Sequence, residues 1–128
     1  MRHRNTKATL NRPADVRKAM VRNLLTSLFL YGKVRTTAAR GRVLQSEAEK
    51  LVSRSKGKPS FNMIRELQKV LTTENASKNA ADFITALKRN SGCTRSTKVG
   101  IREGDGSLLV QVELIAEKKG RKQLYDKT

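Results

Sequence analysis

Cysteine, histidine and aromatic residues are scarce in this chain of 128 residues. There is one cysteine, Cys93, one histidine, His3, and no tryptophan, and aromatic residues make up 4% of the sequence. A single cysteine excludes an internal disulfide and fits a reducing compartment, so we expect a cytoplasmic protein, with a processed organellar form as the alternative. So few aromatic side chains argue against a base-stacking sheet of the RNA-recognition type.

The same scarcity argues against catalysis and against a bound metal. His3 and Cys93 lie far apart in the sequence, and neither has a neighbour that would orient or activate it. A zinc site needs more His and Cys than the chain has, and no glycine-rich phosphate loop is present. Glu47 and Glu49 are two residues apart, which places them on different faces of a helix. We therefore expect no enzyme, no metal, no cofactor and no small-molecule substrate, and we interpret Cys93 as a minor packing residue at the start of a strand.

Long apolar runs are also missing. The longest, around residues 24–31, is interrupted by Thr26 and Ser27 and is too short to span a bilayer. No apolar run follows Met1-Arg2-His3-Arg4, so we expect no signal peptide. The sequence therefore predicts no membrane partner.

Positive charge is what the sequence has in excess. Lys and Arg number 28 against 11 acidic residues, which gives a net charge of +17. Residues 1–58 alone hold 15 basic and 3 acidic residues. Self-repulsion of this size works against a compact state, and a polyanion is the usual partner that compensates it. We therefore expect a nucleic acid to bind, mainly to the first half of the chain.

Apolar periodicity predicts the order helix, strand, three helices, two strands. Pro13 suits the first turn of the first helix, and Gly32 suits its C-terminal cap. Helices are expected from Pro13 to the Gly32 cap, with apolar spacing from Val16, and over residues 38–55, 61–71 and 76–88. Strands are expected over residues 33–37, 94–101 and 108–115, the last two forming an antiparallel hairpin. We expect Thr36 or Thr37 to cap the second helix and Ser60 to cap the third.

These elements predict a single α+β domain over residues 13–116. A small three-stranded sheet packs against helices on one face, which gives two layers. The apolar stripes expected to form the core are Val16, Met20, Leu24 and Leu28 in the first helix, Leu44, Ala48, Leu51 and Val52 in the second, Ile64, Leu67 and Leu71 in the third, and Ala80, Phe83, Ile84 and Leu87 in the fourth.

The two ends of the chain are expected to lie outside this domain. Residues 1–12 contain one sizeable aliphatic residue, Leu10, and cannot form a core. We interpret them as an extended basic arm that becomes ordered on RNA, and residues 117–128 as a polar basic tail. An idle solvated tail is the simpler interpretation of the arm, but it leaves the charge of residues 1–58 unexplained.

Twelve residues form the predicted RNA-binding set. The planar guanidinium of Arg suits phosphate oxygens, and basic residues of the first helix, the strand and the second helix continue the path from the arm. A phosphate at the start of the second helix would offset the unfavourable interaction of Arg40 and Arg42 with the helix dipole. The set is Arg2, His3, Arg4, Lys7, Arg12, Arg17, Lys18, Arg22, Lys33, Arg35, Arg40 and Arg42.

A series of short motifs runs along residues 1–116. They are Met1-Arg2-His3-Arg4, Leu10-Asn11-Arg12, residues 17–24, residues 33–37, Ala48-Glu49-Lys50-Leu51, Gly92, Thr94-Arg95, Lys98, Gly100, residues 102–105 and Val112-Glu113-Leu114. In this order they resemble the bacterial large-subunit ribosomal protein seventeen family. The chain departs from that family at Cys93, where an aromatic residue is usual, and at Ser96-Thr97, where the pair is usually more apolar.

The resemblance implies a non-catalytic structural component of the large ribosomal subunit. It implies binding to large-subunit ribosomal RNA near the exit of the nascent-chain tunnel, neighbouring large-subunit ribosomal proteins as further partners, and one copy per ribosome. The alternatives are a DNA-binding regulator, with the third and fourth helices as a helix-turn-helix, and a ribosome-associated factor that comes and goes. The low net charge of those two helices argues against the DNA-binding alternative.

Overall fold

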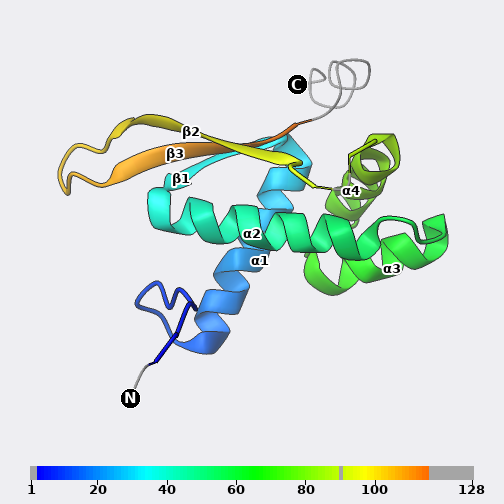
Figure 1. The fold of residues 1–128 in the computed structure, drawn as a ribbon, viewed down its shortest axis with the longest axis horizontal. Helices are drawn as coiled ribbons and strands as arrows, with labels where there is room; N and C mark the ends of the chain where they lie inside the picture. The colour runs from blue at the N-terminus through cyan, green and yellow to red at the C-terminus, as the bar shows by residue number, and fades with distance from the viewer. Residues whose placement is uncertain (1–2, 90, 116–128) are drawn as a thin grey trace.

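The computed structural model describes residues 3–89 and 91–115, and these residues form four helices and one small antiparallel sheet (Figure 1). The elements are α1 (Ala14–Tyr31), β1 (Lys33–Thr37), α2 (Ala38–Ser55), α3 (Ser60–Val70), α4 (Glu74–Ala86), β2 (Thr94–Ile101) and β3 (Leu108–Leu114). The predicted α+β class and the predicted order of elements are confirmed. Arg2 and the C-terminal tail of residues 117–128 lie outside the described residues.

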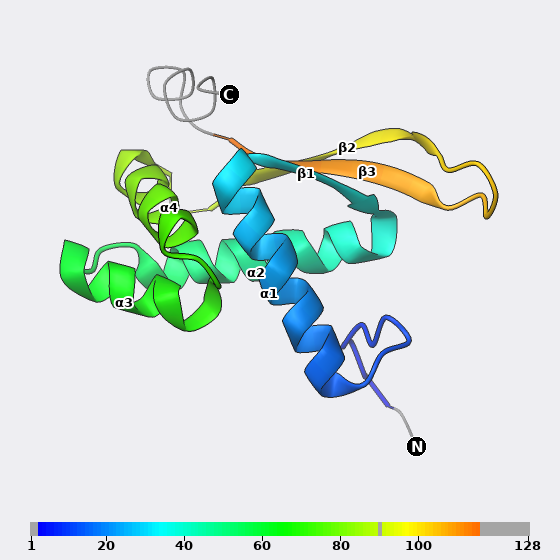
Figure 2. The same cartoon turned by 180° about the vertical axis from the view of Figure 1, so that it is seen from behind.

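The sheet has the strand order β1-β3-β2, so the last strand of the chain lies in the middle. Both pairings are antiparallel, with Val112 facing Val34 of β1 on one side and Ser96 of β2 on the other. Alternate residues of β3 (Val110, Val112 and Leu114) are buried. Helices α1 and α2 lie on that side of the sheet, and in the described residues no helix covers the other side (Figures 1 and 2). The predicted two-layer arrangement is therefore confirmed.

The core lies where α1, α2, α3 and α4 meet beneath the sheet. Phe29 of α1 and Phe83 of α4 are buried and meet edge to face, with ring centroids 6.3 Å apart and ring planes at 61°. This geometry is favourable for two aromatic rings and adds to the burial of their surfaces. The stripes predicted for α2 and α4 are fully buried, so their helical periodicity identified the core correctly.

Three predicted core residues were wrong, and one of them is Met20 of α1, which is only partly buried and lies outside the core cluster. Val16 is 46% exposed, because the first half of α1 extends beyond the other elements and its apolar stripe has nothing to pack against (Figures 1 and 2). In α3 the buried residue is Met63, and its neighbour Ile64 is only partly buried. Met63 and Ile64 are adjacent in the sequence and therefore point in different directions around α3. The direction from which α4 approaches decides which of the two side chains is buried.

The ends of the helices depend on local capping interactions, and for α4 the apolar periodicity predicted the wrong first residue. The helix begins at Glu74, two residues before the predicted start, because the Thr73 side chain accepts a hydrogen bond from the Ala76 N–H. Gly32 ends α1 in the left-handed conformation and donates its N–H to the Leu28 carbonyl, as predicted. The predicted caps of α2 and α3 make no side-chain hydrogen bond: Thr37 precedes α2 without one, and Ser60 lies inside α3.

Glu49 fastens the start of β2 to α2. Its carboxylate accepts hydrogen bonds from the Gly92 N–H and from the N–H and the hydroxyl of Thr94, at 3.1–3.2 Å. Cys93, between those two residues, is fully buried in the core. The interpretation of Cys93 as a packing residue is therefore confirmed, and this position cannot stack on a base.

Cys93 makes the stability of the fold sensitive to high pH. Burial raises the pKa of its thiol from 9.0 to about 12, and the Glu49 carboxylate adds to the increase. The folded state therefore holds this proton between pH 9 and 12, where the unfolded chain has lost it. We expect the free energy of unfolding to fall by about 1.4 kcal/mol per pH unit in this range.

Urea unfolding at pH 8, 9 and 10 measures this effect. Cys93→Ala is the control, because it removes the thiol and keeps every lysine and tyrosine that also titrates at high pH. The pH dependence should be steeper in the native protein than in Cys93→Ala. Equal slopes in the two proteins would contradict the assignment.

Candidate nucleic-acid interface

The first half of α1 extends away from the core and carries predicted site residues into the open. Buried residues of α1 begin only at Leu25. Lys18 is exposed and Arg17 is partly exposed, on turns that extend beyond α2 and the sheet (Figures 1 and 2). A helix that leaves its core in this way presents its cations to a large partner on several sides.

The described part of the N-terminal segment lies beside the start of α1. Residues 3–12 are exposed apart from Leu10, which is partly exposed. The hydrogen bonds of residues 5–12 are local: the Arg12 N–H donates to the Thr9 carbonyl, and the Arg17 guanidinium donates to the Arg12 carbonyl at 3.2 Å. The segment therefore adds no buried surface of its own to the core, and Arg4, Lys7 and Arg12 are all exposed to solvent.

Two further predicted residues lie on the helix-free face of the sheet. Lys33 and Arg35 alternate along β1 with Val34 and Thr36, which face the helices. The Arg35 Nε donates to the Gln111 side chain at 3.3 Å, a weak bond on an open surface. These two cations therefore face a different side of the molecule from the helices.

Arg40 and Arg42 lie in the first turns of α2, on either side of Gly41. Gly41 is buried against β3, and Arg42 is exposed. The first turn of α2 holds no acidic residue, and its capping residue Thr37 gives no side-chain hydrogen bond. In both views this turn lies at the same end of the molecule as the first half of α1, opposite α3 and α4 (Figures 1 and 2).

Arg22 has a structural contact that the sequence did not reveal. Its Nε donates to the carbonyl of Val70, the last residue of α3, at 2.9 Å. One turn later Thr26 accepts bonds from the N–H and the hydroxyl of Thr72, both at 3.1 Å. Arg22 therefore helps to fix α1 against the end of α3, and only its remaining N–H groups are available to a partner.

Most acidic residues of the described part of the chain bind groups outside the predicted RNA-binding set. Glu47, Glu66, Glu74, Asp105 and Glu113 each form an ion pair, and Glu49 binds backbone groups. The basic partners in those ion pairs are Lys50, Lys58, Lys69, Lys78, Arg95 and Arg102. Within residues 3–89 and 91–115, no ion pair involves any lysine or arginine of the predicted RNA-binding set. The ion pairs among the described residues thus lie from Glu47 onward, and the described lysines and arginines of the predicted set stay outside them.

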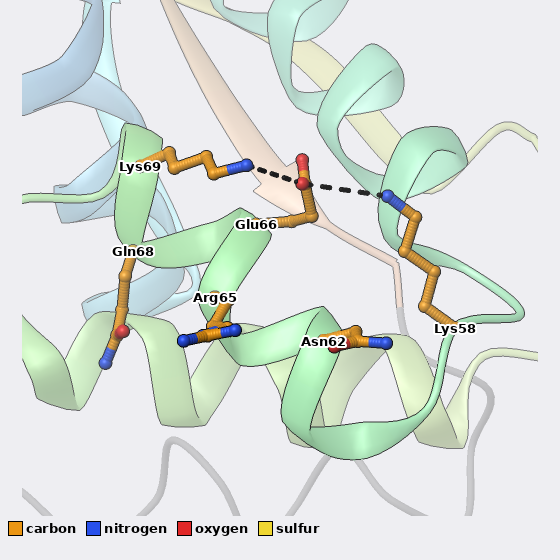
Figure 3. A pocket seen from close by; sticks show the side chains of 6 residues that line it. All are labelled: Lys58, Asn62, Arg65, Glu66, Gln68 and Lys69. Carbon is orange, nitrogen blue, oxygen red and sulfur yellow. Dashed lines mark hydrogen bonds and ion pairs between the residues drawn. The ribbon is translucent and has the colours of Figure 1, made fainter.

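A shallow depression beside α3 is a second candidate for a functional site, apart from the predicted RNA-binding residues (Figure 3). It is lined by Lys58, Asn62, Arg65, Glu66, Gln68 and Lys69. Glu66 lies between two lysines, at 2.8 Å from Lys69 and 3.9 Å from Lys58 (Figure 3). The Lys69 ammonium first, and then Lys58, lower the pKa of the Glu66 carboxyl, so this group is ionised and has no proton to donate near neutral pH. The depression therefore offers no acid–base pair for catalysis.

Helices α3 and α4 do not make a DNA-reading pair. The residues of α4 that would face a groove include Glu74, Lys78 and Asp82, and Lys78 is paired with Glu74 at 2.8 Å. The pair lowers the pKa of Glu74, and α4 carries two acidic residues against one basic residue, so its exposed charge is slightly negative. Phosphate repels such a surface, which argues against the predicted alternative of a DNA-binding regulator.

The described residues hold neither a metal-ligand cluster nor a membrane-spanning helix. No group of three or more His, Cys, Asp or Glu side chains there is placed to hold a metal ion. Among the same residues, no helix is both long enough and apolar enough to cross a membrane.

These features define a class of protein: a small, strongly basic α+β protein whose fold presents unneutralised cations. Known sequences lead to a family within that class. Residues 20–115 match the model of the family described as Ribosomal protein L17. The chain is 42% identical over 108 residues to the large ribosomal subunit protein bL17 of Clostridium perfringens, covering 83% of this chain and 95% of that protein. It is 38% identical over 125 residues to the bL17 protein of Desulforapulum autotrophicum, covering 91% and 98%.

The chain therefore belongs to the ribosomal protein L17 family. This confirms the family that the sequence motifs indicated. A family of ribosomal proteins also confirms the prediction that the chain is not an enzyme.

Proposed function

We propose that the chain is a structural protein of the large ribosomal subunit that binds large-subunit ribosomal RNA through one end of its fold. The observation that carries this proposal is the segregation of charge. Ion pairs neutralise cations on α2, α3, α4 and the β2–β3 hairpin, while among residues 3–42 the lysines and arginines of the N-terminal segment, α1, β1 and the first turns of α2 stay without an acidic partner.

The mechanism is charge neutralisation combined with positioning. Each cation that meets a phosphate releases a condensed counterion, which gives affinity that falls with salt. The body holds the first half of α1 in a fixed direction, because its second half is packed in the core through Leu25, Leu28 and Phe29. The basic arm, starting from this helix, then enters the RNA and becomes ordered there. The family resemblance supports, as part of this proposal, one copy per ribosome near the nascent-chain tunnel exit in the bacterial cytoplasm.

The charge segregation is tested by two variants of equal charge. Lys18→Gln/Arg42→Gln removes two exposed cations without ion pairs, whereas Lys69→Gln/Lys78→Gln removes two exposed cations that are held by Glu66 and Glu74. Binding to protein-free large-subunit RNA is measured over a range of salt concentrations. We expect the first variant to lower the salt slope by about 2, one for each lost phosphate contact.

The second variant separates contact from net charge. It should leave the slope at the native value, because its lysines do not meet the RNA. Equal losses in the two variants would show that only the overall charge matters, and the proposed interface would be wrong.

A ribosome-associated factor is the remaining alternative, and salt washing distinguishes it. An integral protein is expected to stay with large subunits through a high-salt wash and sedimentation, whereas a factor held by exposed charge alone should be released. Quantitative release would refute the structural role while leaving RNA binding intact.

A further inference from the structure

The β2–β3 hairpin extends beyond the helices that cover the rest of the sheet. In both views its tip continues past the first turn of α2 (Figures 1 and 2). Ile101 and Leu108 face each other at the last pair before the turn. Leu108 also follows the alternation of Val110 and Val112, so it lies on the side of β3 that the helices bury further along. At the hairpin tip, the face of the sheet that elsewhere packs against α1 and α2 therefore extends beyond these helices.

Aliphatic side chains are exposed on this overhang. Ile101 is 72% exposed, Val99 is 45% exposed and Leu108 is 37% exposed. We call these three residues the apolar tip. They lie close together on one hairpin end, so they form a small cluster rather than the scattered exposed apolar residues that are ordinary on protein surfaces.

The hairpin is electrically neutral in a chain whose net charge is +17. Residues 94–115 hold three basic and three acidic residues. The Arg95 guanidinium is bound to the Glu113 carboxylate across the strands, and the Arg102 guanidinium is bound to Asp105 in the turn. The two remaining charges, Lys98 and Glu103, are exposed and of opposite sign, so phosphate gains little net attraction by approaching this surface.

From this contrast we propose that the apolar tip docks against another protein of the same subunit, a basic RNA-binding polypeptide whose apolar side chains cover Ile101 and Leu108. The proposal rests on the proposed function, since it takes the partner from the same particle. A protein that binds the same RNA is itself basic, so the positive end of this chain repels it. The hairpin, on which Lys98 and Glu103 form no ion pair within the described residues and balance each other in charge, lets it approach.

Two further observations restrict which partner can cover the apolar tip. A second copy of this chain is disfavoured, because it brings another +17 of charge to the same place. The register of β2 shifts between Lys98 and Gly100, next to the tip. Such a bulge interrupts the regular row of backbone groups on an edge strand. The partner therefore meets side chains rather than adding a strand to β2.

The test compares Ile101→Asn with the control Thr97→Asn, an exposed residue of the same strand that faces Gln111. We expect Ile101→Asn to bind protein-free large-subunit RNA with native affinity and salt slope. Its retention in complete large subunits during washes of increasing salt should fall on the order of tenfold, while Thr97→Asn behaves as the native protein. Weakened binding of Ile101→Asn to free RNA would mean that RNA covers the tip. Native behaviour in both assays would mean that nothing covers it.

A photocrosslinker identifies the occupant directly. Benzoylphenylalanine in place of Ile101 is incorporated into subunits reconstituted from purified RNA and proteins, and adducts are mapped by mass spectrometry. The expected adduct joins position 101 to a different ribosomal protein, and an adduct to RNA or to a second copy overturns the proposal. Failure of the native chain to bind ribosomal RNA at all would instead refute the proposed function.

Discussion

Deleting residues 2–12 should lower the affinity for large-subunit RNA by about tenfold or more at physiological salt and reduce the salt slope by about 4. The deletion removes four cations, Arg2, Arg4, Lys7 and Arg12. Those in the described residues form no ion pair within the fold, so each is available to a phosphate. The measurement is a filter-binding or fluorescence titration repeated at several salt concentrations.

The deletion should leave the body folded, which makes the result interpretable. Residues 3–12 are exposed apart from Leu10, and the backbone bonds of residues 5–12 are local. The loss of the bond from Arg17 to the Arg12 carbonyl is a small cost on the surface. The midpoint of thermal unfolding is therefore expected to stay within a few degrees of the native value.

A charge-matched control is available in the paired cations. Lys50, Lys69, Lys78 and Arg102 each lie in an ion pair, and replacing all four with Gln removes the same formal charge as the deletion. This control should keep most of the salt slope. A truncated protein with native affinity and native slope would show that the arm is an idle tail.

The order of elements was predictable because each has a strong local signal. Gly32 ends α1 in the left-handed conformation that glycine favours, and the strand over residues 108–114 alternates apolar residues that the fold buries, from Val110 on, with partly buried ones. The sequence did not predict that β3 lies between the other two strands. Alternation of apolar residues indicates that one face of a strand is buried, but not which strands are its neighbours. Val16 shows the same limit, because helical spacing shows that a stripe exists but not whether another element covers it.

The sequence predicted that the candidate site is rich in cations, but not which of these cations the fold leaves without an acidic partner. The sequence places most cations in residues 1–58, yet which of them are neutralised depends on tertiary neighbours. The pair between Arg95 and Glu113 joins strands that meet only in the folded sheet. Arg22 is the reverse case: a residue selected for RNA also binds the end of α3, 48 positions along the chain. Ion pairs at separations of three or four, such as Glu74 with Lys78, are those that a sequence reveals.

Gly41→Ala should destabilise the fold by about 2 kcal/mol, against the usual trend for glycine in a helix. Alanine normally improves the interior of a helix by about 1 kcal/mol. At Gly41, however, an added Cβ would lie 2.6 Å from a γ-methyl carbon of Val110 and 3.5 Å from one of Val112. Helix α2 therefore approaches β3 as closely as it does because this position has no side chain.

A double-mutant cycle with Val110→Ala tests that contact. Val110→Ala alone should also destabilise, since Val110 is buried. In Gly41→Ala/Val110→Ala the new methyl group takes the space of the one removed, so the double variant should be more stable than the two single effects predict by about 1 kcal/mol or more. Additive losses in urea unfolding would show that the clash does not limit the packing.

The same substitution connects the packing of α2 to RNA binding. Gly41 lies between Arg40 and Arg42, so a shift of α2 away from β3 moves both cations relative to α1. At temperatures where Gly41→Ala is still folded, its RNA affinity should fall, and Val110→Ala added to it should restore part of the loss. If Val110→Ala alone lowered the RNA affinity in proportion to its loss of stability, unfolding would explain the lower affinity instead. Recovery in the double variant would show that the close approach of α2 to β3 serves to position these two arginines.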